Sequence, residues 1–336
     1  MTARVGLWTW LCVGSALCLV LFASMLVGHV ELSVDEVIAG MLGGGTEHAT
    51  TIVQELRLPR TLIGLLVGAS LGLAGAAMQG LLRNPLAEPG VIGVSGCAGL
   101  GAVLVFYSGL SASFVLALPL GGMLGALVAV MLLYVLAGAS RSGRSATLTL
   151  ILGGVALNAF AGAMTSLALN LSANPFAAYE VVFWLMGSLA DRSMEHVLLC
   201  LVPMVIGAGL ILASGRGLDA LSLGEPTAHS LGVNLPRIRL FVILGTGMAV
   251  GSAVAVSGMI GFVGLVVPHL LRPFVGHQPS RLLPLSAAGG ALLLIAADLV
   301  VRMVPTAIEL KIGVVTAIVG APFFLMLILR HRRGAL

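Results

Sequence analysis

The chain has 336 residues, of which 59% are hydrophobic and only 9% are charged, and its mean hydropathy is +1.12. A soluble globular domain is usually about 45–50% apolar and about 25% charged, so this composition excludes a water-soluble protein of the same size. It also excludes an intrinsically disordered chain, which would have low hydrophobicity and high net charge. A polytopic membrane protein remains, and at about 20 residues per spanning helix the apolar residues allow up to about ten spans.

Ten apolar segments follow one another along the chain, and we expect each to form a membrane helix. The first segment competes with a signal peptide, but it lacks a small-x-small cleavage site followed by a polar mature region. The segment 259–271 is short for an untilted span and contains Pro268. The break at Asn174-Pro175 predicts a short or re-entrant helix over 174–190. The expected spans are 6–28, 61–82, 91–108, 114–138, 146–171, 196–214, 238–256, 259–271, 282–303 and 311–329.

Ten crossings place both chain ends on the same side of the membrane, and the basic residues indicate which side that is. One set of connecting segments holds 12 of the 17 basic residues, the other holds 5, and most of the acidic residues lie with the 5. Cytoplasmic segments carry an excess of Arg and Lys, so we predict cytoplasmic N- and C-termini. The set of 12 is Arg4, Arg83, Arg141, Arg144, Arg216, Arg237, Arg239, Arg272, Arg281, Arg330, Arg332 and Arg333, and the set of 5 is Arg57, Arg60, Arg192, Arg302 and Lys311.

Small residues recur at helical spacing in the second expected span, at Gly64, Gly68, Gly72 and Gly75. Such small-xxx-small ladders allow helix backbones to approach closely in lipid. The pattern therefore predicts that this span packs tightly against its neighbours.

No constellation for catalysis, metal binding or nucleotide hydrolysis is visible. The motif HExxH is absent, and the four cysteines lie in apolar stretches without a CxxC pair. A P-loop requires Gly-Lys-Ser/Thr, but the only lysine, Lys311, lies between Leu310 and Ile312. We therefore expect no catalytic residue, no metal and no cofactor. Active transport would need either an ATP-hydrolysing partner chain or an ion gradient.

Asp298 is the one acidic residue that lies clearly within an expected span. Intramembrane carboxylates often mark ion or proton pathways, which makes a gradient-driven carrier an alternative. A structural pairing with a neighbouring helix explains the residue equally well. An intramembrane enzyme that uses Asp298 and His269 is a further alternative, although these two residues lie on different spans.

The segment 215–238 is the longest connection on the predicted cytoplasmic side. Gly224 ends one helical turn, and Glu225-Pro226 begins another, with proline at a position that the first turn tolerates. Leu231 and Val233 are apolar although they should face water. We interpret the segment as two short helices along the membrane with one face against a partner, or as a loop packed on its own bundle.

This segment resembles the coupling-loop motif of the FecCD family, the permease subunits of ABC importers for iron-siderophores, haem and cobalamin. Further stretches are similar to motifs of the same family, and together the matches run from about residue 55 to 330. They are 56–60 (LRLPR), 75–80 (GAAMQG), 83–90 (RNPLAEPG), 258–272, 313–317 (GVVTA) and 320–324 (GAPFF).

The resemblance implies an all-α polytopic membrane protein with about ten transmembrane helices, which is the type II ABC importer permease fold. It implies one domain over 1–336, with a cytoplasmic coupling loop at about 215–238. It implies a subunit of the bacterial inner membrane that works with a second permease copy. Two ATP-binding subunits would bind below and a periplasmic substrate-binding protein above. Nucleic acid is not an expected partner.

Family roles carry over by position to two groups of residues. Arg57, Arg60 and Arg302 would meet acidic residues of the binding protein on the outer face, although an interface anchor or an internal ion pair with Glu55 or Glu309 is the alternative for each. The cytoplasmic group would sit in a groove on the ATPase and transmit its closure. It consists of Leu221, Gly224, Glu225, Pro226, Ala228, His229, Leu231 and Gly232.

The cargo is weakly determined by the sequence, because the binding protein sets most of the specificity in such importers. Iron chelates are the commonest cargo of the family, so a ferric siderophore ranks first, haem second and cobalamin third. The family often has proline at the Lys311 position, and this departure bears on which binding protein docks.

Overall fold

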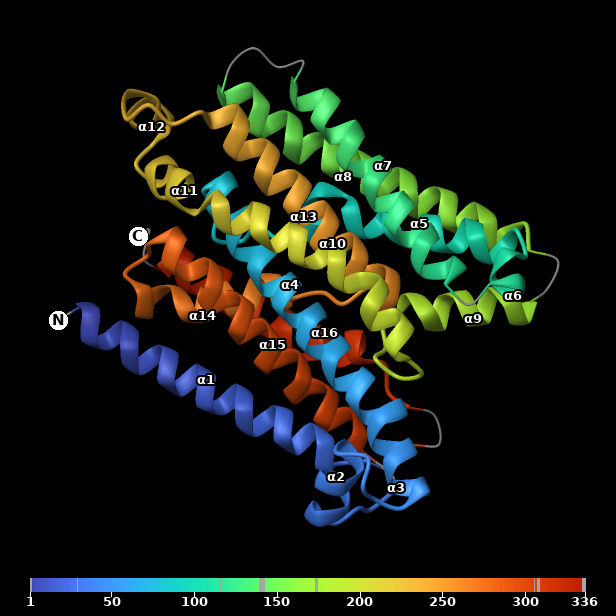
Figure 1. Cartoon of the computed structure of the whole chain (residues 1–336). Helices are drawn as coiled ribbons and strands as arrows, with labels where there is room; N and C mark the ends of the chain where they lie inside the picture. Colours follow the sequence, from blue (N-terminus) through green and yellow to red (C-terminus); the bar gives the residue numbers. More distant parts are fainter. Residues whose placement is uncertain are drawn as a thin grey trace.

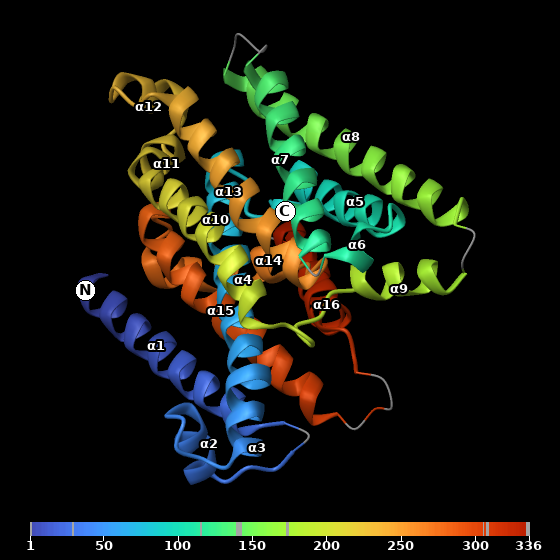
Figure 2. The ribbon, with the colours of Figure 1, turned by 45° about the vertical axis from the view of Figure 1, so that its right-hand side comes forward.

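A computed structural model describes residues 2–28, 30–114, 116–138, 143–172, 175–304, 306 and 309–333, and these form an all-helical bundle (Figures 1 and 2). Arg141 and Asn174, which entered the sequence predictions, lie outside these ranges. The helices are α1 Thr2–Leu26, α2 Val34–Met41, α3 Glu47–Thr51, α4 Leu58–Leu82, α5 Val94–Tyr107, α6 Leu110–Ser113, α7 Ala117–Gly138, α8 Gly143–Asn170, α9 Pro175–Leu185, α10 Met194–Ala213, α11 Gly215–Ser222, α12 Glu225–Ser230, α13 Leu235–Ser257, α14 Val263–Leu271, α15 Pro279–Met303 and α16 Ile312–Arg333.

The described helices confirm the fold class that the sequence predicted. Among the described residues, seven helical stretches are long and apolar enough to cross a membrane, and three shorter apolar helices, Val94–Tyr107, Val263–Val275 and Ile312–Met326, lie where the remaining spans were expected. The span that contains α3 and α4 is longer than the predicted span 61–82. A π-helical turn, Ile52–Arg57, joins the two helices into one continuous stretch from Glu47 to Leu82.

Helix α4 lies in the middle of the bundle and packs against α15, α13, α14 and α10. Its glycine ladder brings backbones together, as the sequence predicted. A Cβ atom on Gly68 would lie 2.5 Å from the Gly290 carbonyl oxygen, and one on Gly72 would lie 2.0 Å from the Ser286 carbonyl oxygen of α15. Because no larger residue fits between these backbones, the glycines set the distance between the two helices.

The two ends of the bundle carry different elements (Figure 1). The start of α1 and the end of α16 lie at the same end as α11 and α12, whereas α2 and α3 lie at the opposite end. We call these the coupling end and the outer end.

Replacement of Gly72 by alanine should force α4 and α15 apart, because the added methyl group would overlap a backbone oxygen rather than a movable side chain. We expect the free energy of unfolding to fall by about 1–3 kcal/mol, the usual cost of overpacking. Thermal unfolding of the detergent-purified chain would measure this. Gly80→Ala is the matched control, because a Cβ atom there meets only the Leu218 side chain at an ordinary 3.6 Å. Equal melting temperatures for the two variants would contradict the packing role of Gly72.

Candidate functional site

The segment 215–238 contains two short helices, as one of its two interpretations expected, and both are held on the bundle itself, as the other expected. Between α11 and α12, Gly224 adopts φ 107° and ψ 152°, a backbone conformation that is essentially restricted to glycine. Glu225 then opens α12 and accepts a hydrogen bond from Arg239 of α13 at 2.9 Å. Asp219 of α11 accepts hydrogen bonds from Ser280 and Gln278 at the start of α15. These contacts fix both helices on the coupling end of the bundle.

The residues predicted for coupling divide into a packed set and a surface set. Leu221 and Ala228 are buried against the bundle, so these two residues position the helices. Pro226, His229, Leu231 and Gly232 are exposed, and Gly224 and Glu225 are half-buried. Leu223, which the sequence reasoning missed, is 66% exposed, and Leu231 is 62% exposed. The coupling helices thus present two exposed leucines that the described residues leave accessible.

At the outer end, arginine side chains donate hydrogen bonds to the carbonyl groups at the C-terminus of α1. The last carbonyl groups of any helix lack an intrahelical partner. Arg57 donates to the carbonyl oxygens of Met25, Leu26 and Val30, and Arg302 donates to those of Ser24 and Val27. Cations at this position also oppose the negative end of the helix dipole. Both side chains are therefore held inside the protein, with exposed fractions of 5% and 8%.

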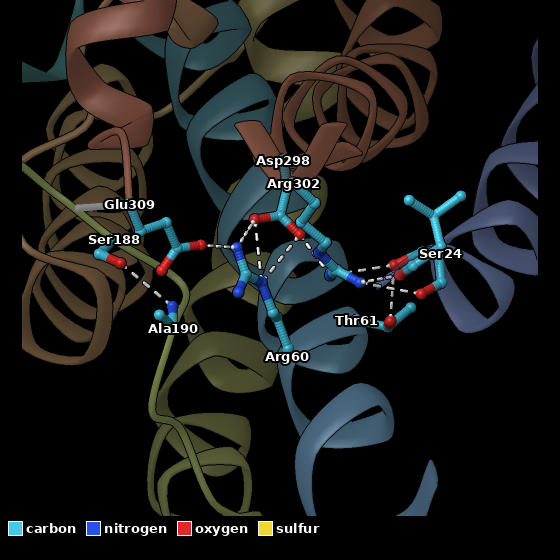
Figure 3. Close-up of polar contacts among 9 residues, drawn as sticks. Ser24, Arg60, Thr61, Ser188, Ala190, Asp298, Arg302 and Glu309 are labelled. Atoms are coloured by element: carbon cyan, nitrogen blue, oxygen red, sulfur yellow. Dashed lines mark hydrogen bonds and ion pairs between the residues drawn. The ribbon is translucent and has the colours of Figure 1, made fainter. Parts of the chain in front are cut away.

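Asp298 lies between two arginines in the same region (Figure 3). Arg60 donates two hydrogen bonds to Asp298 Oδ1, at 2.7 and 3.1 Å, and Arg302 donates to Oδ2. Arg60 also pairs with Glu309, which precedes α16. Asp298 is thus the partner of two cations, which is the structural pairing that the sequence offered as the alternative to a role in ion coupling.

A pocket of about 450 Å³ opens beside this cluster. Arg192 lines it from the connection before α10, and its Nε, like the Nε of Arg302, is buried without a hydrogen-bond partner among the described residues. Burial lowers the pKa of Arg192, and the neighbouring Asp191 opposes that shift. The lining includes Glu55, Arg57, Arg60, Asp191, Arg192, Arg302 and Glu309. We call this cavity the outer pocket.

The three predicted docking arginines all line the outer pocket. The sequence reasoning named Glu309 as an alternative internal partner, and the structure pairs it with Arg60. It did not identify Asp298 as the common partner of two of the arginines, nor Ser24 and Thr61, whose hydroxyl groups lie 2.7 Å apart beside Arg302. The docking role of the arginines stays a prediction.

A second hollow, of about 590 Å³, lies midway along the bundle. Glu88 lines it and accepts a hydrogen bond of 2.8 Å from the backbone N–H of Phe262, the residue before α14. Phe262 has φ 68°, so the chain turns sharply here before the short helix begins. Ser95, Asn158 and Met259 also line this hollow. Glu88 lies in one of the family motifs of the sequence. Its hydrogen bond joins two residues that are 174 positions apart, so no local sequence pattern predicts the contact.

The FecCD transport family model matches residues 16–330 of the chain. The vitamin B12 import system permease protein BtuC of Vibrio cholerae is 45% identical over 280 residues, which are 83% of each chain. The Fe(3+) dicitrate transport system permease protein FecD of Escherichia coli is 40% identical over 86% of this chain and 88% of the relative. The hemin transport system permease protein HmuU of Yersinia pestis is 39% identical over 82% of this chain and 83% of the relative.

A solved structure has the same architecture. It is described as an inward-facing conformation of a metal-chelate type ABC transporter, and it superposes with a TM-score of 0.83 at 33% identity. The match covers 95% of this chain and 98% of the other. With nearly the whole length matched in sequence and in fold, the chain belongs to the FecCD transport family of membrane-spanning ABC importer permeases.

Proposed function

We propose that this chain is the transmembrane half of an ATP-driven importer, forming one permease domain over 1–336 in the inner membrane. Its coupling end faces the cytoplasm, where two ATP-binding subunits bind, and its outer end receives a substrate-binding protein. A second copy of the chain completes the passage. The observation that carries the proposal is the pair α11 and α12, which the bundle holds in place while leaving Leu223 and Leu231 uncovered.

The coupling helices suit the transmission of force to the membrane helices. The Glu225–Arg239 ion pair joins α12 to α13, and Asp219 joins α11 to the start of α15. The side chain of Leu218 in α11 lies against Gly80 of α4. A displacement of α11 and α12 by an ATPase subunit would therefore reach three membrane helices directly.

Leu223→Asp should remove the ATPase subunits from the purified complex, because it places a charge on the proposed apolar contact. Replacement of a hot-spot residue of an interface commonly costs 2 kcal/mol or more of binding free energy, so we expect co-purified ATPase to fall by more than about tenfold.

Gly224→Asp should abolish ATP-dependent uptake while expression persists, because a side chain strains the turn between α11 and α12. Leu42→Asp is the matched control for ATPase content, since Leu42 is 82% exposed at the outer end, away from the coupling helices. Normal ATPase content and uptake in both coupling variants would refute the coupling role.

We further propose that the outer pocket binds acidic side chains of the substrate-binding protein. Arg60 is the most exposed of the three predicted arginines and faces the pocket, while Arg57 and Arg302 shape its wall. Complementary charges of this kind mainly set orientation and association rate.

Arg60→Gln should weaken binding-protein affinity by about tenfold or more, which is a typical loss for one partner of a partly buried charge pair. Asp298 keeps Arg302 as its partner in this variant, so the fold should survive. Surface-immobilised binding protein and the permease–ATPase complex in nanodiscs would give the dissociation constant. An unchanged constant at low salt, with a normal melting temperature, would refute docking at Arg60.

For the cargo we propose a ferric siderophore, with haem and cobalamin as the competing cargoes. Relatives named for ferric dicitrate, ferric enterobactin and hemin transport support an iron-containing compound. Relatives named for vitamin B12 import, at 45% and 38% identity, support cobalamin as a competing cargo.

ATPase stimulation in liposomes separates these cargoes. The complex would be reconstituted with its binding protein loaded with a ferric siderophore, haem or cobalamin. We expect the ferric siderophore form to raise ATP hydrolysis above that of the empty binding protein. Stimulation by haem or cobalamin alone would replace our cargo while keeping the importer function.

A further inference from the structure

The outer pocket already contains a carboxylate that occupies one of its cations. Glu309 lies in the connection between α15 and α16 and pairs with Arg60 (Figure 3). Glu309 contacts Arg60 from this connecting segment, whereas Asp298 contacts Arg60 from α15. Arg60 is therefore shared between one carboxylate that belongs to the membrane helices and one that belongs to a connecting segment.

The two carboxylates differ in how easily they can be replaced. The Asp298 side chain is 3% exposed and binds both Arg60 and Arg302, so its removal would leave the buried Arg302 without its ion-pair partner and Arg60 with Glu309 alone. The Glu309 side chain is 25% exposed, and Arg60 is its one ion-pair partner among the described residues. A pair with one partly exposed member is more easily replaced than a fully buried one, so an incoming carboxylate can take the place of Glu309.

The pocket also has hydrogen-bonding capacity that Glu309 does not use. Arg192 makes no ion pair within the described part of the chain, and the Nε atoms of Arg192 and Arg302 donate to nothing there. Buried donors without acceptors are rare in folded proteins. The outer pocket thus offers an acidic group more donors than Glu309 satisfies.

We propose that Glu309 holds, in the free permease, the place at Arg60 that an acidic side chain of the substrate-binding protein takes on docking. Glu309 is thereby an intramolecular competitor that weakens docking. This inference rests on the proposed docking at the outer pocket.

The test compares binding-protein affinity for Glu309→Gln and Glu55→Gln in the nanodisc complex. Glu55 lines the same pocket but has no ion pair with Arg60, so Glu55→Gln makes the same change in charge without freeing that cation. We expect Glu309→Gln to tighten binding by about fivefold more than Glu55→Gln, which corresponds to the loss of one partly exposed pair. The excess should persist at about 1 M salt, where the screening length is about 3 Å and long-range attraction is lost.

A double-variant cycle identifies the contact responsible. In an Arg60→Gln background, Glu309→Gln should no longer tighten binding, because the competed cation is absent. If Glu309→Gln weakens docking, or matches Glu55→Gln, the competitor role is overturned although docking at Arg60 stands. If Arg60→Gln alone leaves the affinity unchanged, docking at this pocket fails and the inference fails with it. Glu309→Ala provides a second variant, and melting temperatures confirm that each complex is folded.

Discussion

The carbonyl groups at the end of α1 impose the constraint on which the outer half of the molecule depends. Lipid offers no donors to these groups, so the protein must supply them. Arg57 and Arg302 do so from the start of α4 and the end of α15. The buried Arg302 in turn requires a nearby carboxylate, and Asp298 provides it while also binding Arg60. One unsatisfied helix end thus leads to a polar cluster that fixes α1, α4 and α15 to one another.

Helix α4 connects this cluster with the other end of the bundle. Arg60, in the first turn of α4, belongs to the outer cluster. The glycines of α4 bring the helix against the backbones of α15 and α14. Near its end, Gln79 accepts a hydrogen bond from Arg272 and donates to the carbonyl oxygens of Gly264 and Leu265. Close backbone contact leaves little freedom for sliding, so α4 forms a stiff link between the outer pocket and the coupling helices.

The short helix α14 is the main irregularity in this arrangement. A helix that begins within the bundle leaves its first N–H groups without intrahelical acceptors. The carboxylate of Glu88 accepts from the N–H of Phe262, and a negative charge at this end also suits the helix dipole. Broken helices of this kind commonly border the passage of membrane transporters, and α14 does border the hollow that Glu88, Ser95 and Asn158 line.

The sequence by itself determined the class of the protein, its helical segments and its family. Composition, span length and the spacing of Gly64, Gly68 and Gly72 are local properties, and lipid acts on them in the same way wherever the segment lies. It also located the coupling segment, because Gly224 and Glu225-Pro226 mark a turn between two short helices.

Only the tertiary structure decided how the charged groups are used. Arg57, Arg60 and Arg302 look alike in the sequence and all line the outer pocket, yet Arg57 and Arg302 donate to the end of α1, whereas Arg60 and Arg302 pair with Asp298. Their partners lie up to 278 positions away, and no local pattern encodes such a pairing. The physical reason is that a charge inside a membrane protein must find its partner in three dimensions, and the fold determines which groups are close enough to serve.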